Sequence, residues 1–399
     1  MATVSEIQQY NNWTVIPNDF YDTYLATEHI KDYGLEIPNN VLQVFKEKLE
    51  AENIYVGNDE VIKEIIAGII KGNIILQGPP GTGKTTIARI LCEVFNTECM
   101  ECTAVSDWTT YDTIGGLQPS VNEDEQEIVT SKNGKIVDSL LQCSNTILSK
   151  EEHDGSKQAS WLMIDELNRC EIDKVFGDLF TVFGTDSDEF EKSISLWFET
   201  DENKKKIYVP TRYRIIGAMN NIDKNYVSDI SQGLSRRFTF ITLLPPREES
   251  FSEELSYVKT KAMKRVCSKL GDYNGVDIAK VTSLLEDMAF KEAETVMCKL
   301  IKHIRYENDK DYLGLQLGTA QIIDSYENIL LNMVLFGYES QDDKKKEIQT
   351  IIDSTVCNRI VPQMDGFDWE RLSAFYDYIK SDGEYDWFIK TKESIRQKI

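Results

Sequence analysis

The chain has 399 residues, of which 41% are hydrophobic and 10% aromatic, and its formal net charge is -23 at pH 7. This length allows two or three domains, and the apolar content supports folded cores and excludes a largely disordered chain. A strongly acidic protein repels phosphate backbones unless basic residues gather on one surface. We therefore expect no direct DNA binding by this chain alone.

The sequence shows no sign of a membrane or secretory segment. The apolar stretch from Ile65 to Ile70 is flanked by charged residues and falls far short of the roughly 20 residues that a membrane span needs. The first residues, Met1 to Glu6, contain neither the basic nor the apolar region of a secretory signal. We expect a cytoplasmic protein that does not contact a membrane.

The predicted elements change character along the chain. Residues 1–50 are polar and form a short N-terminal extension with one helical stretch at 41–49. Residues 51–246 alternate strands with amphipathic segments, the pattern of a parallel sheet covered by helices on both faces. The strands are expected at residues 74–77, 98–103, 161–164 and 214–218.

After residue 246 the strand signals end and helical periodicity dominates to the C-terminus. We therefore predict an α/β P-loop domain followed by a helical lid and C-terminal helical region at 247–399. The clearest helical patterns lie at residues 278–290, 292–304 and 319–331.

A glycine-rich loop connects the first expected strand to a helical segment that includes Thr86. The loop matches G-x-x-x-x-G-K-[ST] in full, as Gly78, Pro79, Pro80, Gly81, Thr82, Gly83, Lys84 and Thr85. The glycines let backbone N–H groups converge on phosphate oxygens, Lys84 reaches the β- and γ-phosphates, and the Thr85 hydroxyl is a Mg²⁺ ligand. The sequence therefore predicts that residues 78–86 bind a nucleoside triphosphate, with ATP and Mg²⁺ as the cofactors.

Two carboxylates, Asp165 and Glu166, close the apolar run 161–164. Ligands of open α/β sheets bind at the carboxyl ends of the strands, so both acids should face the nucleotide. We predict that Asp165 orients Mg²⁺ and that Glu166 accepts a proton from the attacking water. The alternative is a pair of solvated acids at a strand end, which the preceding loop makes the weaker interpretation.

Polar and basic residues follow the next apolar run, residues 214–219. An amide at Asn220 can hold the attacking water, and the neighbouring Asn221 or a turn-capping role are the alternatives. Arg236 and Arg237 follow further along the chain. A guanidinium from a neighbouring subunit can stabilise a transferring phosphoryl group, although spacing alone would make these two arginines a surface pair.

Taken together, four runs resemble the AAA+ ATPases, in the branch that contains the McrB restriction GTPase, the MoxR chaperones and dynein-like modules. The runs are residues 78–85, 164–169, 217–220 and 234–238. The Ile-Asp-Glu-Leu-Asn-Arg run and residues 175–179 are most similar to McrB relatives. The resemblance spans roughly residues 55–246. Residues 108–116 and a hairpin at 198–210, of a kind that faces a central pore, also resemble this branch.

The resemblance implies a hexameric ring with ATP sites between subunits. Asn220 then corresponds to the first sensor, and Arg236 or Arg237, with Arg237 preferred, to the arginine that acts on the neighbour's nucleotide. Residues 313–321 resemble the lid helix but lack the arginine of a second sensor. McrB carries a DNA-reading domain and prefers GTP, whereas only about fifty residues precede the motor here. ATP is therefore expected, without DNA reading.

Three hypotheses for the function follow. The first is an ATP hydrolase that remodels or drives a separate effector or client protein, as the motor subunit of a McrBC-like restriction or anti-phage defence system. The second is a MoxR-like chaperone that matures a partner protein. The third is an ATP-gated assembly scaffold with negligible turnover, which the presence of both Glu166 and the Arg236–Arg237 pair disfavours because a scaffold needs neither.

Overall fold

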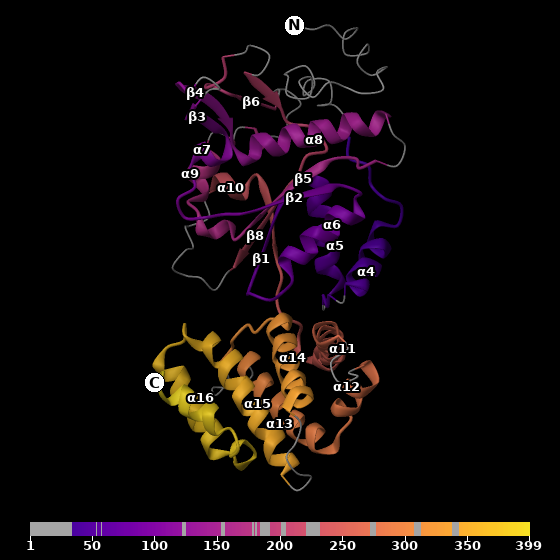
Figure 1. Cartoon of the computed structure of the whole chain (residues 1–399), viewed down its shortest axis with the longest axis vertical. Coiled ribbons are helices and arrows are strands. Elements are labelled where there is room, and N and C mark those ends of the chain that lie inside the picture. The colour runs from indigo at the N-terminus through magenta and orange to yellow at the C-terminus, as the bar shows by residue number, and fades with distance from the viewer. Residues whose placement is uncertain are drawn as a thin grey trace. The chain divides into compact units, whose positions relative to one another are not determined.

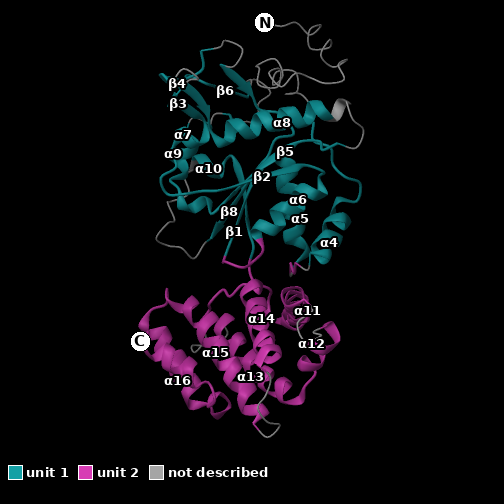
Figure 2. Cartoon of the chain, in the orientation of Figure 1, with its two compact units in different colours: residues 1–52, 58–78, 84–243 teal, residues 53–57, 79–83, 244–399 magenta. Residues whose placement is uncertain are grey.

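The computed structural model describes most of the chain. The described residues are 34–52, 54–56, 58–121, 125–152, 156–177, 179, 182–183, 192–200, 205–220, 232–271, 277–306, 313–336 and 343–399. Contacts divide the chain into two compact units (Figure 2). The first contains residues up to 52, 58–78 and 84–243, and the second contains 53–57, 79–83 and 244–399.

A five-stranded sheet with the order β2-β5-β8-β1-β9 forms the centre of the first unit. All of its neighbouring strands are parallel. The strands are β1 (Asn73–Gly78), β2 (Glu98–Thr103), β5 (Ser160–Asp165), β8 (Ile215–Asn220) and β9 (Phe238–Thr242). The predicted α/β fold is confirmed, and the four expected strands are present together with β9. Central strands read as continuous apolar runs because helices cover both of their faces.

Helices pack against this sheet and fix the positions of its strand ends. The helices of the first unit are α4 (Val41–Ala51), α5 (Asp59–Lys71), α6 (Lys84–Val94), α7 (Thr110–Thr113), α8 (Lys135–Glu152), α9 (Ile172–Phe176) and α10 (Gln232–Ser235). Helices α5 and α6 lie beside β1, α4 packs against α5 and α6, and α8 packs against β5 (Figure 1). The apolar faces of α5 and α6 supply buried side chains such as Ile65, Ile69, Ile87 and Leu91.

Two antiparallel hairpins extend the first unit. One pairs β3 (Gly115–Val121) with β4 (Glu127–Asn133), and the other pairs β6 (Ser193–Ser195) with β7 (Lys206–Tyr208). The prediction of a hairpin at residues 198–210 was wrong in its starting point, because the first strand of the hairpin, β6, lies before residue 198. The strand is only three residues long, so its one buried residue, Ile194, gives almost no periodic signal in the sequence.

The second unit is helical in its described residues from 248 onwards. Its α-helices are α11 (Phe251–Leu270), α12 (Ile278–Leu285), α13 (Met288–Arg305), α14 (Thr319–Phe336), α15 (Lys344–Arg359), α16 (Trp369–Ser381) and α17 (Ile389–Arg396). The helix expected at 278–290 is interrupted, because the Asp287 side chain accepts the amides of Ala289 and Phe290 and starts a new helix. The predicted domain limits at residues 50 and 246 stay predictions.

A buried ion pair lies in the core of the helical unit. Arg305 donates to both carboxylate oxygens of Glu254, at 2.5 and 3.0 Å, and both side chains are 1% exposed. The Thr319 hydroxyl donates to the same carboxylate at 2.6 Å. These contacts join α11, α13 and the first residue of α14.

None of the helices in the described ranges combines the length and apolar character that crossing a bilayer requires.

A second buried guanidinium holds helix α5 against the sheet. Arg214 donates to the carbonyls of Ile69 and Ile70 in the last turn of α5, at 2.6 and 3.0 Å. It also donates to the carbonyls of Thr211 and Tyr213, both at 2.8 Å. Burial lowers the pKa of Arg214 to about 10, so the group stays charged at neutral pH. This one side chain thus donates to four backbone carbonyls.

Replacing Arg214 by Met should therefore lower the free energy of unfolding by about 2 to 4 kcal/mol, because buried carbonyls lose their donors. Urea unfolding followed by circular dichroism measures the change. Arg89→Met is the matched control, since Arg89 pairs with Glu101 in an exposed position and such pairs contribute about 0 to 1 kcal/mol. Equal losses in the two variants would contradict the role of Arg214.

Candidate functional site

The carboxyl ends of β1, β5 and β8 form the edge of the sheet where the predicted residues gather. Parallel pairing places Gly78 of β1 opposite Asn220 of β8. Strand β5 is the other neighbour of β8 and ends in Asp165. Ligands of open parallel sheets bind at this edge, because loops from adjacent strands diverge there.

The glycine-rich loop leaves the end of β1 and leads into α6. Gly81 and Gly83 have φ angles of 79° and 83°, which side chains with a Cβ rarely adopt. The Thr82 hydroxyl donates to the carbonyl of Pro79 at 3.0 Å and closes the loop internally. The glycines at these positions are thus required by the backbone conformation that turns the chain into α6.

Residues at the start of α14 contact the tip of this loop within the second unit. The backbone amide of Ala320 donates to the carbonyl of Gly81 at 3.0 Å. A Cβ atom at Gly318 would lie only 2.4 Å from the carbonyl oxygen of Pro80. The sequence analysis assigned no role to Gly318 or Ala320. Both contacts are made by backbone atoms, so the residue types give no sign of them apart from the glycine at 318.

Lys84 is the first residue of α6 and is largely buried, at 7% exposure. Its ammonium group donates to the carbonyl of Gly78 at 3.0 Å. Burial lowers the pKa of Lys84 to about 8, and the nearby carboxylates of Glu166 and Asp165 oppose that shift. A polyanionic ligand lowers the free energy of such a buried ammonium group, because its negative charge replaces the stabilisation that water gives to an exposed cation.

Thr85 and Asp165 meet as the sequence predicts. The Thr85 hydroxyl donates to one carboxylate oxygen of Asp165 at 3.0 Å, and the amide of Glu166 donates to the other at 2.8 Å. Mg²⁺ prefers hard oxygen ligands and usually takes only one or two from protein, with water and phosphate completing its shell. The Thr85–Asp165 pair fits that requirement. Among the described residues, no group of three or more His, Cys, Asp or Glu side chains forms a separate metal site.

Glu166 is held by two donors at the end of β5. One carboxylate oxygen accepts from the Asn220 amide nitrogen at 2.9 Å, and the other accepts from Arg169 Nε at 3.3 Å. The backbone of Glu166 is left-handed, with φ 53° and ψ 37°, a conformation that costs a non-glycine residue roughly 1 to 2 kcal/mol. The turn after β5 therefore directs this carboxylate toward Asn220 of β8, and the left-handed backbone of Glu166 is strained as a result.

A buried asparagine, Asn168, connects the two strand ends. Its amide nitrogen donates to the carbonyl of Asn220 at 3.4 Å, and its side-chain oxygen accepts the Asn220 amide at 3.3 Å. Asn168 is 1% exposed. The sequence analysis quoted Asn168 and Arg169 as part of a motif but gave them no role. Their signal was a polar pair that only Leu167 separates from the two acids.

Arg236 and Arg237 follow α10 and precede β9. Arg236 is exposed, and Arg237 is half-buried with its guanidinium donating to the carbonyl of Gly233 at 2.9 Å. The hydrogen bonds described above for Asp165 and Glu166 come from Thr85, Asn220, Arg169 and the Glu166 backbone, and neither Arg236 nor Arg237 makes any of these. Asn221, the alternative to Asn220, lies outside the described residues.

The site thus combines a buried lysine, a glycine-rich loop and two adjacent acids around one edge of the sheet. Of the predicted residues, Thr85, Asp165, Glu166 and Asn220 form a connected chain of hydrogen bonds. Such a constellation can bind phosphate groups, hold a divalent cation and accept a proton from a nearby water.

Comparison with known proteins agrees with this geometry. Residues 73–238 match the AAA domain of the dynein-related subfamily. A protein of Escherichia coli (strain K12) described as a type IV methyl-directed restriction enzyme EcoKMcrB subunit is 30% identical over 229 residues. The match covers 54% of this chain and 45% of that protein, so the chain matches just under half the length of this relative. The matched residues and the site geometry together support an AAA domain of the dynein-related subfamily at residues 73–238, in a chain that is similar to an McrB subunit.

Proposed function

We propose that this chain hydrolyses ATP in an oligomeric ring and uses the energy to remodel or drive a partner protein. We further propose that it serves as the motor subunit of a McrBC-like restriction or anti-phage defence system. The observation that carries the proposal is the connected set Thr85–Asp165–Glu166–Asn220 beside the buried Lys84. A protein that only binds nucleotide needs no carboxylate next to its metal-binding acid.

In this proposal each residue of the site has one task. The glycine-rich loop and Lys84 bind the phosphates, and Thr85 and Asp165 hold Mg²⁺, which when bound neutralises the charge that develops on the phosphate oxygens. Glu166 takes a proton from the attacking water, and Asn220 positions that water or the carboxylate. Water then displaces ADP from the γ-phosphorus, and inorganic phosphate leaves.

The arrangement of Glu166 in this structure suggests how turnover is restrained. Both of its oxygens already accept hydrogen bonds, from Asn220 and from Arg169. A water that donates to either oxygen has to share that oxygen with one of these donors or displace the donor. We propose that one of the two donors moves away when a nucleotide and its attacking water enter.

The chain's acidic charge bears on the partner. A net charge of -23 favours association with a basic protein surface and opposes unassisted contact with a nucleic-acid backbone. The relative's printed name places that protein in a methyl-directed restriction enzyme. We propose the corresponding role, with a separate effector polypeptide, for this chain.

Glu166→Gln is the central test. The amide keeps the shape of the side chain but cannot accept a proton, so ATP binding should persist while steady-state hydrolysis falls by about 10² to 10⁴-fold. Phosphate release measures turnover, and a fluorescent ATP analogue measures binding. Glu171→Gln is the matched control, because Glu171 is exposed and lies five residues further along. Unchanged hydrolysis in Glu166→Gln would refute its role as base.

Because the pKa of Lys84 is lowered, we predict that ATP binding is accompanied by an uptake of protons that depends on pH. Its pKa is about 8 without nucleotide, and bound phosphates should raise it because they favour the charged form. The complex then binds more protons than the free protein in the range above pH 7. At pH 8 binding should take up about half a proton per site, and at pH 6.5 almost none.

Calorimetry of ATP binding in buffers of different ionisation enthalpy measures this uptake. Lys84→Arg is the control, because a guanidinium stays charged throughout this pH range. Wherever that variant still binds, its proton uptake at pH 8 should vanish. A wild-type enthalpy that does not depend on the buffer at pH 8 would show that the lysine is already charged before ATP binds.

Arg236 and Arg237 are proposed to complete the site of a neighbouring subunit, with Arg237 preferred. Alanine at the acting arginine should lower turnover by about 10³-fold or more while ATP binding persists. Mixing Arg237→Ala subunits with Glu166→Gln subunits should restore part of the activity, because some interfaces then combine an intact base with an intact arginine. Arg247→Ala, at another exposed arginine, is the control. Wild-type activity of both the Arg236 and Arg237 variants would exclude either residue from this role.

A further inference from the structure

The buried ion pair of the helical unit has no part in the hydrolysis described above. Arg305 donates to both carboxylate oxygens of Glu254, and both side chains are 1% exposed. Well-packed apolar residues in place of a buried ion pair often leave stability unchanged or raise it, so stability alone does not account for the pair. What the pair supplies is a charged acceptor of fixed orientation inside the core, which apolar side chains do not offer.

This acceptor holds the first residue of α14. The Thr319 hydroxyl donates to Glu254 Oε1 at 2.6 Å, and Arg305 donates to the same oxygen at 3.0 Å. A short hydrogen bond to an ionised acceptor is stronger and more directional than one between neutral groups. The start of α14 is therefore fixed against α11 and α13.

The same end of α14 contacts the tip of the glycine-rich loop. The amide of Ala320, next to Thr319, donates to the carbonyl of Gly81 at 3.0 Å. A Cβ atom at Gly318 would lie 2.4 Å from the carbonyl oxygen of Pro80, so the two backbones meet more closely than any other residue would allow. Residues 79–83 belong to the same compact unit as α14, and both contacts are internal to that unit.

The bond to Gly81 determines how the loop presents its next amide. The carbonyl of Gly81 and the N–H of Thr82 belong to one peptide, and the described residues contain no cis peptide. The two groups of a trans peptide point in opposite directions, so the bond from Ala320 directs the Thr82 N–H away from α14. Gly81 and Gly83 leave the loop wide conformational freedom. Ordering such a loop before the ligand arrives raises affinity, because binding no longer has to order it.

We propose that Glu254, Arg305 and Thr319 are positioning residues for the phosphate loop. They fix the start of α14, and α14 holds the loop tip in the conformation that receives the phosphates. Residues 313–321 contain no arginine to act as a second sensor, and the backbone contact at Gly81 links the helical unit to the nucleotide instead. The inference rests on the proposed binding of ATP by this loop and adds the residues that set its affinity.

Thr319→Val tests the hydroxyl with little change of shape. The Kd and KM for ATP should rise about tenfold, because the start of α14 loses its charged acceptor. The kcat should stay within about twofold of the wild type, because the residues that act on the attacking water are untouched. Thr319→Ser keeps the hydroxyl and should restore affinity to within about threefold. A fluorescent ATP analogue measures Kd, and phosphate release measures KM and kcat.

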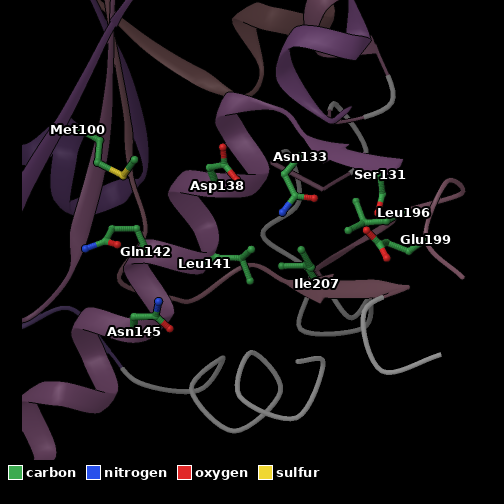
Figure 3. Close-up of a pocket in the computed structure, with 10 residues that line it drawn as sticks. All are labelled: Met100, Ser131, Asn133, Asp138, Leu141, Gln142, Asn145, Leu196, Glu199 and Ile207. Atoms are coloured by element: carbon green, nitrogen blue, oxygen red, sulfur yellow. The ribbon is translucent and has the colours of Figure 1, made fainter. Parts of the chain in front are cut away.

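Two controls remove a hydroxyl elsewhere. Thr350→Val lies on an exposed face of α15, where the hydroxyl donates to the Lys346 carbonyl of its own helix. Ser131→Ala lies on β4, at the wall of an open cavity of about 550 Å³ in the first unit (Figure 3). Neither change should alter ATP binding.

Gly318→Ala tests the close approach of the backbones. The added methyl group forces the start of α14 away from Pro80, so ATP should bind at least about tenfold more weakly. Gly366→Ala is the matched control, because a Cβ atom there meets nothing within 4 Å. Its ATP affinity should equal that of the wild type.

The double replacement Glu254→Leu/Arg305→Met separates positioning from stability. It removes both charges together and should leave the midpoint of urea unfolding nearly unchanged. ATP should still bind about tenfold more weakly, and adding Thr319→Val should weaken binding no further, because the acceptor of the hydroxyl is already gone.

These measurements can overturn the inference without touching the proposed hydrolysis. It fails if Thr319→Val or Gly318→Ala binds ATP as tightly as the wild type. It also fails if Thr319→Val lowers kcat about tenfold and leaves KM unchanged, or if the serine variant does not restore affinity. A wild-type protein that does not bind ATP would refute the proposed function itself, and this inference with it.

Discussion

The hydrogen bond between Thr85 and Asp165 is the contact on which the rest of the site depends. It joins residues 80 positions apart, one at the start of α6 and one at the end of β5, at 3.0 Å. Its geometry follows from the parallel sheet, because the buried apolar strands fix their own register and bring their carboxyl ends to one edge. With that register in place, Lys84, Asp165 and Glu166 need no further long-range contact to share a site.

The fold fixes the orientation of the Glu166 carboxylate through its backbone conformation and its hydrogen bonds. Its left-handed backbone turns the carboxylate toward β8, and Asn168 ties the same turn to the backbone of Asn220. The strain at Glu166 persists because these buried contacts over-determine the turn. In the role that we propose, activity then requires only a change of hydrogen-bond partner at the carboxylate, from Asn220 or Arg169 to water. Such a change is small and is well suited to control by a neighbouring subunit.

The parts of this structure that the sequence predicts are those with a local signal. The glycine-rich loop, the acids after residues 161–164 and the strand that ends in Asn220 are each contiguous runs, and the structure brings Thr85, Asp165, Glu166 and Asn220 together. The role of Asn168 was missed because its value lies in a contact 52 positions away. The role of Arg214 was missed for the same reason, since two of the carbonyls to which it donates lie 145 and 144 positions away, in α5.

Helix α8 supports the two strands on one side of the sheet. Gln142 and Thr146 of α8 donate to Glu98 at the start of β2, and the helix also packs against β5, the strand that ends in Asp165. A packed interior transmits small displacements because it has few voids to absorb them. A displacement of α8 would therefore be passed on to β5, which carries Asp165 at its end. Since a hydrogen bond weakens steeply as its geometry departs from the optimum, a movement of less than about 1 Å at β5 would be enough to alter the metal-binding pair.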